Sequence, residues 1–150
     1  MALANIAVLL ARSGKKVLIV DWDLEAPGME RYFKDFEILH TSKEKRGLLN
    51  LLHDASNSFP RNIPNWEDYL SFIYIKDNSI DFLTSGRKDD ESSQKEHAKK
   101  LYNFDWNKFY KDYDGSEFIE SLRKQWLNNY EIIFIDSRTG ITDSGGICTI

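Results

Sequence analysis

Residues 17–28, VLIVDWDLEAPG, decide the fold, because an unbroken apolar run delivers two aspartates into a loop that turns at Pro27 and Gly28. A second apolar run lies near the other end of the chain, in residues 132–140, IIFIDSRTG, and closes on Asp136. Short continuous apolar runs that end in acids are typical of buried strands in a parallel sheet. The two runs therefore predict an α/β fold with a mostly parallel sheet flanked by helices.

The acids at the ends of these two runs are the first candidates for a functional site. Asp21 and Asp23 follow the first run and Asp136 ends the second. Ligands of open α/β sheets bind beyond the carboxyl ends of the strands. Aspartate also suits turns and caps, so Asp21 and Asp23 taken alone leave a structural role equally open. Together the three acids favour a divalent cation, for which carboxylates are suitable ligands, and a phosphorylated ligand.

The size and composition of the chain are those of a single globular domain. It has 150 residues, of which 41% are hydrophobic and 29% charged, unlike a disordered chain. A net charge of −4 does not indicate direct nucleic-acid binding, although a local basic patch stays open. The short basic clusters Lys43/Lys45/Arg46 and Lys99/Lys100 are typical of a solvated surface.

Cysteine usage and hydropathy predict a cytoplasmic protein without a transmembrane segment. The single cysteine, Cys148, cannot form a disulfide within the chain, which favours a reducing compartment. No apolar stretch approaches the ~20 residues that cross a bilayer. In the apolar start of the chain the positive charges follow the apolar run, whereas a signal peptide has them before it.

Hydrophobic spacing predicts helices and strands in alternation along the chain. Gly14 suits the left-handed position after the first helix, and Asp114 with Glu117 fits a capping box for the last helix. The expected helices cover residues 2–13, 29–36, 47–55 and one that starts after Asp114 and ends at Asn128-Asn129; the expected strands cover 17–22, 71–75, 80–83 and 131–136; and residues 56–70 and 87–100 are loops, the second leading into a solvent-facing helix.

The two acid-bearing segments resemble those of a known family of P-loop ATPases, the ParA/MinD family. VLIVDWDLEAPG resembles its deviant Walker A′ segment, and IIFIDSRTG resembles its Walker B and switch II region. MALANIAVLLARSGKKVLIVD is similar to the helix after the phosphate-binding loop, running into the second strand, and IDFLTSGR is similar to the next core strand. The resemblance is closest to the ParA-like group with a KGGVGR-variant loop, and residues 29–79 have little counterpart.

The resemblance implies a role for each candidate residue. Asp23 matches the acid that positions or activates the attacking water, and Asp21 would lie near the metal and its water shell. Asp136 matches the Walker B acid that holds Mg²⁺. Gly140 would be the switch glycine that responds to the γ-phosphate, and Arg138 would contact phosphate or a partner, with a plain surface position as its alternative.

The chain departs from the family at the phosphate-binding loop. A P-loop needs successive backbone N–H groups around the phosphates and a cation, and no glycine-rich lysine loop occurs in this sequence. The family's loop would end immediately before Met1, and the sequence stops at Ile150, just after switch II. We therefore expect residues 1–150 to be a partial nucleotide-binding domain, truncated at both ends, that does not bind ATP tightly by itself.

The resemblance implies that the intact protein is a Mg²⁺-dependent ATPase that binds ATP, dimerises through the nucleotide and switches a protein partner that the sequence does not identify. The alternative is a non-catalytic interaction or scaffold module derived from a degenerate ATPase core, which the missing loop would suit. A receiver-like phosphoacceptor domain finds little support, because five regular strand–helix repeats are not evident. His40, His53 and His97 show no spacing typical of metal ligands.

Overall fold

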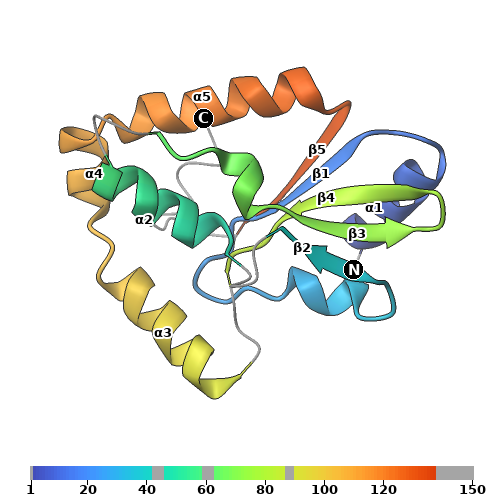
Figure 1. Ribbon diagram of the computed structural model, residues 1–150, viewed down its shortest axis with the longest axis horizontal. Coiled ribbons are helices and arrows are strands. Elements are labelled where there is room, and N and C mark those ends of the chain that lie inside the picture. Colours follow the sequence, from blue (N-terminus) through green and yellow to red (C-terminus); the bar gives the residue numbers. More distant parts are fainter. Residues whose placement is uncertain (1, 42–45, 59–62, 87–89, 138–150) are drawn as a thin grey trace.

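A five-stranded sheet with the order β2-β3-β4-β1-β5 is the framework of the chain (Figure 1). The computed structural model describes residues 2–41, 46–58, 63–86 and 90–137. Their elements are α1 (Ala2–Arg12), β1 (Val17–Asp21), the 3-10 helix η1 (Met29–Phe33), β2 (Ile38–His40), α2 (Leu48–Ser58), the 3-10 helix η2 (Trp66–Tyr69), β3 (Ser71–Ile75), β4 (Asn78–Leu83), α3 (Glu91–Tyr102), α4 (Trp106–Asp112), α5 (Gly115–Asn129) and β5 (Ile132–Asp136).

The sheet is mixed, so the prediction of a mostly parallel sheet is correct only in part. β1 pairs in parallel with both β4 and β5, as the apolar runs predict. β3 is antiparallel to both β4 and β2. β3 and β4 are joined by only Lys76 and Asp77, with Lys76 at φ 55°. A connection this short joins only antiparallel strands, since a parallel pair needs a crossover of a dozen or more residues.

Strand β1 lies between β4 and β5 and is buried along its whole length. Its side chains alternate between two apolar clusters, because successive residues of a strand point to opposite faces. Val17 and Ile19 pack with α1 and η1, and Leu18 and Val20 pack with α2, α4 and α5. In Figure 1, α2, α3, α4 and α5 gather to the left, and α1 lies at the right.

Helix α1 packs on the sheet through small side chains. Ala4, Ala7 and Ala11 are buried, which allows the helix backbone to approach the strands closely. Gly14 ends the helix at φ 83°, and the amides of Gly14 and Lys15 donate to the carbonyls of Ala11 and Leu10. This is the predicted left-handed helix end.

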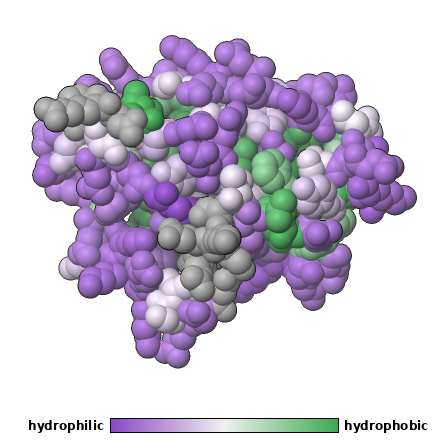
Figure 2. Space-filling model, in the orientation of Figure 1, coloured by the Kyte–Doolittle hydropathy of each residue, from purple (hydrophilic) through white to green (hydrophobic). Residues whose placement is uncertain are grey.

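Part of the apolar surface is uncovered. Ile6 and Leu9 on the outer face of α1 are 47% and 64% exposed, and Ile135 is 43% exposed on β5, at the edge of the sheet. Figure 2 shows that hydrophilic side chains cover most of this face of the molecule and that hydrophobic ones form small areas, most of them right of centre. None of the described helices is both long enough and apolar enough to span a membrane.

The predicted capping box at Asp114 is wrong. Asp114 adopts a left-handed conformation at φ 49°, and its side chain makes no capping hydrogen bond to α5. The following Gly115 lies so close to Phe109 that a Cβ atom there would be 2.5 Å from the ring. The tight turn between α4 and α5 therefore takes precedence over capping. A capping box does occur at α3, between Asp90 and Ser93.

The start of α2 is attached to the end of β4. The amide of Leu48 donates to the carbonyl of Thr84 at 2.7 Å, and the amide of Leu49 donates to that of Ser85 at 3.2 Å. The approach requires Gly47, because a Cβ atom there would lie 2.3 Å from the Thr84 carbonyl oxygen and 2.6 Å from the Gly86 nitrogen. This contact fixes the position of the polar residues that follow β4.

Replacing Gly47 by alanine tests this attachment. We expect Gly47→Ala to lower the free energy of unfolding by about 2–3 kcal/mol, because the backbone atoms of β4 and α2 must move apart. The control is Gly28→Ala, because a Cβ atom at Gly28 meets nothing within 4 Å. It should change the free energy by less than about 0.5 kcal/mol. Urea unfolding measures both, and equal effects would contradict the steric explanation.

Candidate functional site

Two of the predicted acids occupy neighbouring positions at the carboxyl edge of the sheet. Asp21 and Asp136 are direct partners in the parallel register of β1 and β5. The amide of Trp22 donates to the carbonyl of Asp136 at 2.8 Å and continues this pairing past the strand end. Paired residues of neighbouring strands point to the same face. The fold thus places both side chains on the same face at neighbouring strand ends, with Asp21 only 2% exposed.

Asp23 belongs to the same edge, as predicted. Its Oδ1 accepts a hydrogen bond from the amide of Ala26 at 3.0 Å, which holds the turn after β1. Burial, and secondarily the negative charge of Asp23, raise the pKa of Asp136 above its usual 3.8. Asp23 and Asp136 therefore interact electrostatically, although more than 100 residues separate them in the chain. All three predicted carboxylates gather at one end of the sheet.

Strand β4 brings hydroxyl groups to this edge. Thr84 and Ser85 follow β4 directly and are 4% and 3% exposed. The IDFLTSGR segment predicts a core strand, but its pattern indicates no role for these two residues. One sequence feature could have indicated them: the TSG turn directly follows an apolar strand, just as the acids follow the apolar strands β1 and β5.

A cavity of about 1020 Å³ opens at the ends of β1 and β4. Its volume is at the upper end of the range of small-molecule pockets, roughly 300–1,000 Å³. Asp21, Thr84 and Ser85 form its floor at the strand ends, and α3 contributes His97 and Tyr102 to its wall. The cavity can therefore hold a ligand against both carboxylate and hydroxyl groups.

His97 connects α3 to this edge, a role that sequence analysis did not detect. Its Nε2 donates to the carbonyl oxygen of Leu24 at 2.9 Å; a carbonyl only accepts, so this nitrogen carries the proton. Its Nδ1 lies 3.3 Å from where a Cβ atom of Gly86 would be, so glycine leaves room for the ring. His97 thereby holds the residue next to Asp23 in place.

The described residues do not form a complete metal cage. Within residues 2–41, 46–58, 63–86 and 90–137, no three His, Cys, Asp or Glu side chains are grouped so as to hold a metal ion. Asp21 and Asp136 suit Mg²⁺ by chemistry, because this ion prefers carboxylates and keeps several water ligands. Arg138 and Gly140, also predicted for the site, lie outside the described residues.

Comparisons with known proteins identify similar folds but no family for this chain. No protein-family model and no curated protein matches the chain. The solved structures that resemble it include the chimerical protein CapA2B2, with a TM-score of 0.52, and the kinase domain of VpsO, with a TM-score of 0.50, each at 23% identity. The matches cover 94% and 93% of this chain but 48% and 53% of those chains, so it spans about half their length. They show a shared α/β fold, and the ParA/MinD resemblance stays a prediction.

The hydrogen bond of His97 can be tested by substitution. We expect His97→Phe to lower the free energy of unfolding by about 1–3 kcal/mol, because it removes the donor to the buried Leu24 carbonyl. His97→Gln keeps a donor and should lose less. His53→Gln is the control, since that imidazole bonds to Asn57 on an exposed part of α2. Urea unfolding measures all three; an equal loss in His97→Phe and His97→Gln would contradict the role of the hydrogen bond.

The closeness of Asp23 and Asp136 predicts a coupled titration. In Asp23→Asn, which keeps an oxygen for the Ala26 amide, the pKa of Asp136 should fall toward 3.8. A raised pKa in the folded state gives stability that is present below pH 3.8 and lost as the pH rises through the raised value. The variant should lose less stability across this window. Carboxyl ¹³C NMR measures the pKa of Asp136. The control is Asp35→Asn, which should leave this pKa unchanged because the charge of Asp35 does not contribute to the shift.

Proposed function

We propose that this chain is the part of a Mg²⁺-dependent ATPase that carries the metal and water-positioning acids. The observation that carries the proposal is the parallel register that sets Asp21 opposite Asp136, with Asp23 in the next turn. Three aspartates at the carboxyl edge of the sheet are suited to a cation, and through that cation to a phosphorylated ligand. Nucleotide binding would control dimerisation and a protein partner, so the ATPase would act as a switch.

Each acid would have its own task. Asp136 and Asp21 would hold the hydrated Mg²⁺, which would neutralise phosphate charge. Asp23 would orient the attacking water; its turn, fixed through Ala26, favours one direction for the carboxylate. Gly140 and Arg138 would respond to the γ-phosphate, as the resemblance implies. Thr84 and Ser85 supply hydroxyl groups on the opposite side of β1 from β5.

The fold neighbours support this proposal at the level of reaction class. One of them is a kinase domain, and kinases also transfer a phosphoryl group. The sequence contains no glycine-rich lysine loop to hold the phosphates. We therefore assign the activity to a whole protein in which this chain is joined by such a loop, contributed by the same or another polypeptide.

A non-catalytic interaction or scaffold module is the second candidate. It is favoured by the missing loop and by the incomplete cation site among the described residues. Such a module would keep the sheet and its apolar packing without needing the charge on Asp23. The two proposals differ in whether Asp23 affects a chemical step.

ATP turnover by the full-length protein separates the two proposals. We expect Mg²⁺-dependent hydrolysis, and Asp23→Asn should lower the rate by about 10²–10⁴-fold while nucleotide binding is retained. Asp35→Asn removes an exposed carboxylate beyond η1 and should have no effect. Phosphate release and a nucleotide-binding assay measure the two properties. A folded full-length protein without turnover would contradict the ATPase and favour the scaffold.

A further inference from the structure

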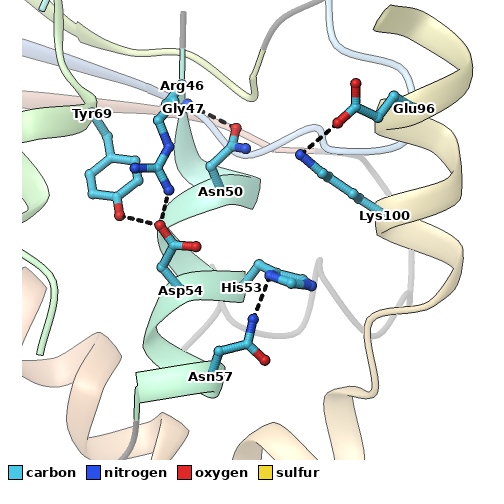
Figure 3. A network of polar contacts seen from close by, with 9 residues as sticks. All are labelled: Arg46, Gly47, Asn50, His53, Asp54, Asn57, Tyr69, Glu96 and Lys100. Atoms are coloured by element: carbon cyan, nitrogen blue, oxygen red, sulfur yellow. Dashed lines mark hydrogen bonds and ion pairs between the residues drawn. The ribbon is translucent and has the colours of Figure 1, made fainter. Parts of the chain in front are cut away.

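A second cavity, of about 340 Å³, lies between α2 and α3. It shares the side chain of His97 with the larger cavity but is lined by different charged groups. Arg46 precedes α2, Asn50 lies in its first turn, and Glu96 and Lys100 project from α3 (Figure 3). Arg46 and Lys100 come from the two basic clusters that sequence analysis assigned to a solvated surface. The fold thus brings one cation of each cluster to the same small cavity.

Arg46 is held in a fixed orientation beside this cavity. Its guanidinium lies over the ring of Tyr69, 4.7 Å from the ring centre, and donates to the carboxylate of Asp54. The hydroxyl of Tyr69 donates to the same carboxylate at 2.6 Å. Asp54 lies outside the lining of the cavity, so it anchors Arg46 from behind. A guanidinium has five N–H donors in a rigid fork, and this anchoring leaves the others available.

Asn50 presents its nitrogen to the cavity. Its Oδ1 accepts from the amide of Gly47 at 3.2 Å, which sets the orientation of the side-chain amide and assigns its Nδ2 to the other side. Figure 3 shows that nitrogen on the side of Lys100. The ammonium of Lys100 donates to Glu96 at 2.9 Å and has two further N–H groups. Residues with side-chain N–H donors from α2, α3 and the position before α2 therefore line one cavity, with the guanidinium of Arg46 turned toward Tyr69 and Asp54 (Figure 3).

We propose that this cavity binds a phosphate monoester or inorganic phosphate, through Arg46, Asn50 and Lys100. Phosphate oxygens accept several charge-assisted hydrogen bonds at once, which a donor-rich cavity requires. Glu96 is the competing acid, but its side chain is 66% exposed, and an exposed ion pair contributes little. The volume accommodates a phosphate together with a small organic group. This site does not depend on the proposed ATPase activity.

The probes are inorganic phosphate and glycerol 3-phosphate, added at constant ionic strength to ¹⁵N-labelled protein. We expect saturable shifts of the Asn50 side-chain signals and of the backbone amide signals of the cavity residues, and the backbone signals report binding in every variant. Stronger binding of glycerol 3-phosphate would identify a monoester as the ligand, and equal binding would identify phosphate itself. Asn50→Asp keeps the oxygen that accepts from Gly47 but removes the Nδ2 donors, so it should abolish binding without lowering the melting temperature.

Helix α3 offers matched charge controls. Lys95 pairs with Glu91 as Lys100 pairs with Glu96, four residues apart, but the first pair lies outside the cavity lining. Lys100→Gln should weaken binding about tenfold, whereas Lys95→Gln should leave it nearly unchanged. Glu96→Gln should tighten it severalfold, and Glu91→Gln should not. Absence of saturable binding, or equal effects inside and outside the cavity, would overturn the proposal.

Discussion

The parallel pairing of β1 with β4 on one side and β5 on the other is the constraint on which the rest of the structure depends. Parallel strands bring their carboxyl ends to one edge, so whatever residues follow them must meet there. β1 is buried on both faces, and a shift by one residue would exchange the side chains that pack in its two apolar clusters. The facing positions of Asp21 and Asp136 follow from hydrophobic packing.

Sequence patterns predicted most elements because their information is local. The apolar runs of β1 and β5, the alanines of α1 and the turn at Gly14 each depend on neighbours a few residues away. One failure is local, because residues 87–100 were predicted as a loop although α3 begins at Glu91 with a capping box at Asp90. Two others have non-local causes. β2 has only three residues, and its pairing with β3 bridges more than 30 residues of chain. At Asp114, the pattern of a capping box was present, but the contact between Gly115 and Phe109 determined the turn.

The residues of the candidate site also divide into those that local sequence patterns predict and those that depend on distant contacts. The three acids were predictable because each ends an apolar strand or begins the turn after it. Thr84 and Ser85 occupy equivalent positions, but hydroxyl residues are so common in turns that their sequence pattern does not distinguish them from ordinary turn residues. His97 was not predictable, since its partner Leu24 is 73 residues away. Arg46 and Lys100 were predicted to lie on a solvated surface, whereas both are half-buried at a common cavity that depends on how α2 and α3 pack.

Glycine determines how closely these distant segments meet. Gly47 allows the first turn of α2 to approach the carbonyls that follow β4, and Gly86 leaves room there for the imidazole of His97. The same imidazole lines both cavities and binds the carbonyl of Leu24, next to Asp23. A displacement of α3 would therefore move a wall of each cavity and the support of the Asp23 turn together. The carboxyl edge and the cavity between α2 and α3 therefore share a structural support, His97, although the polar groups that line them differ.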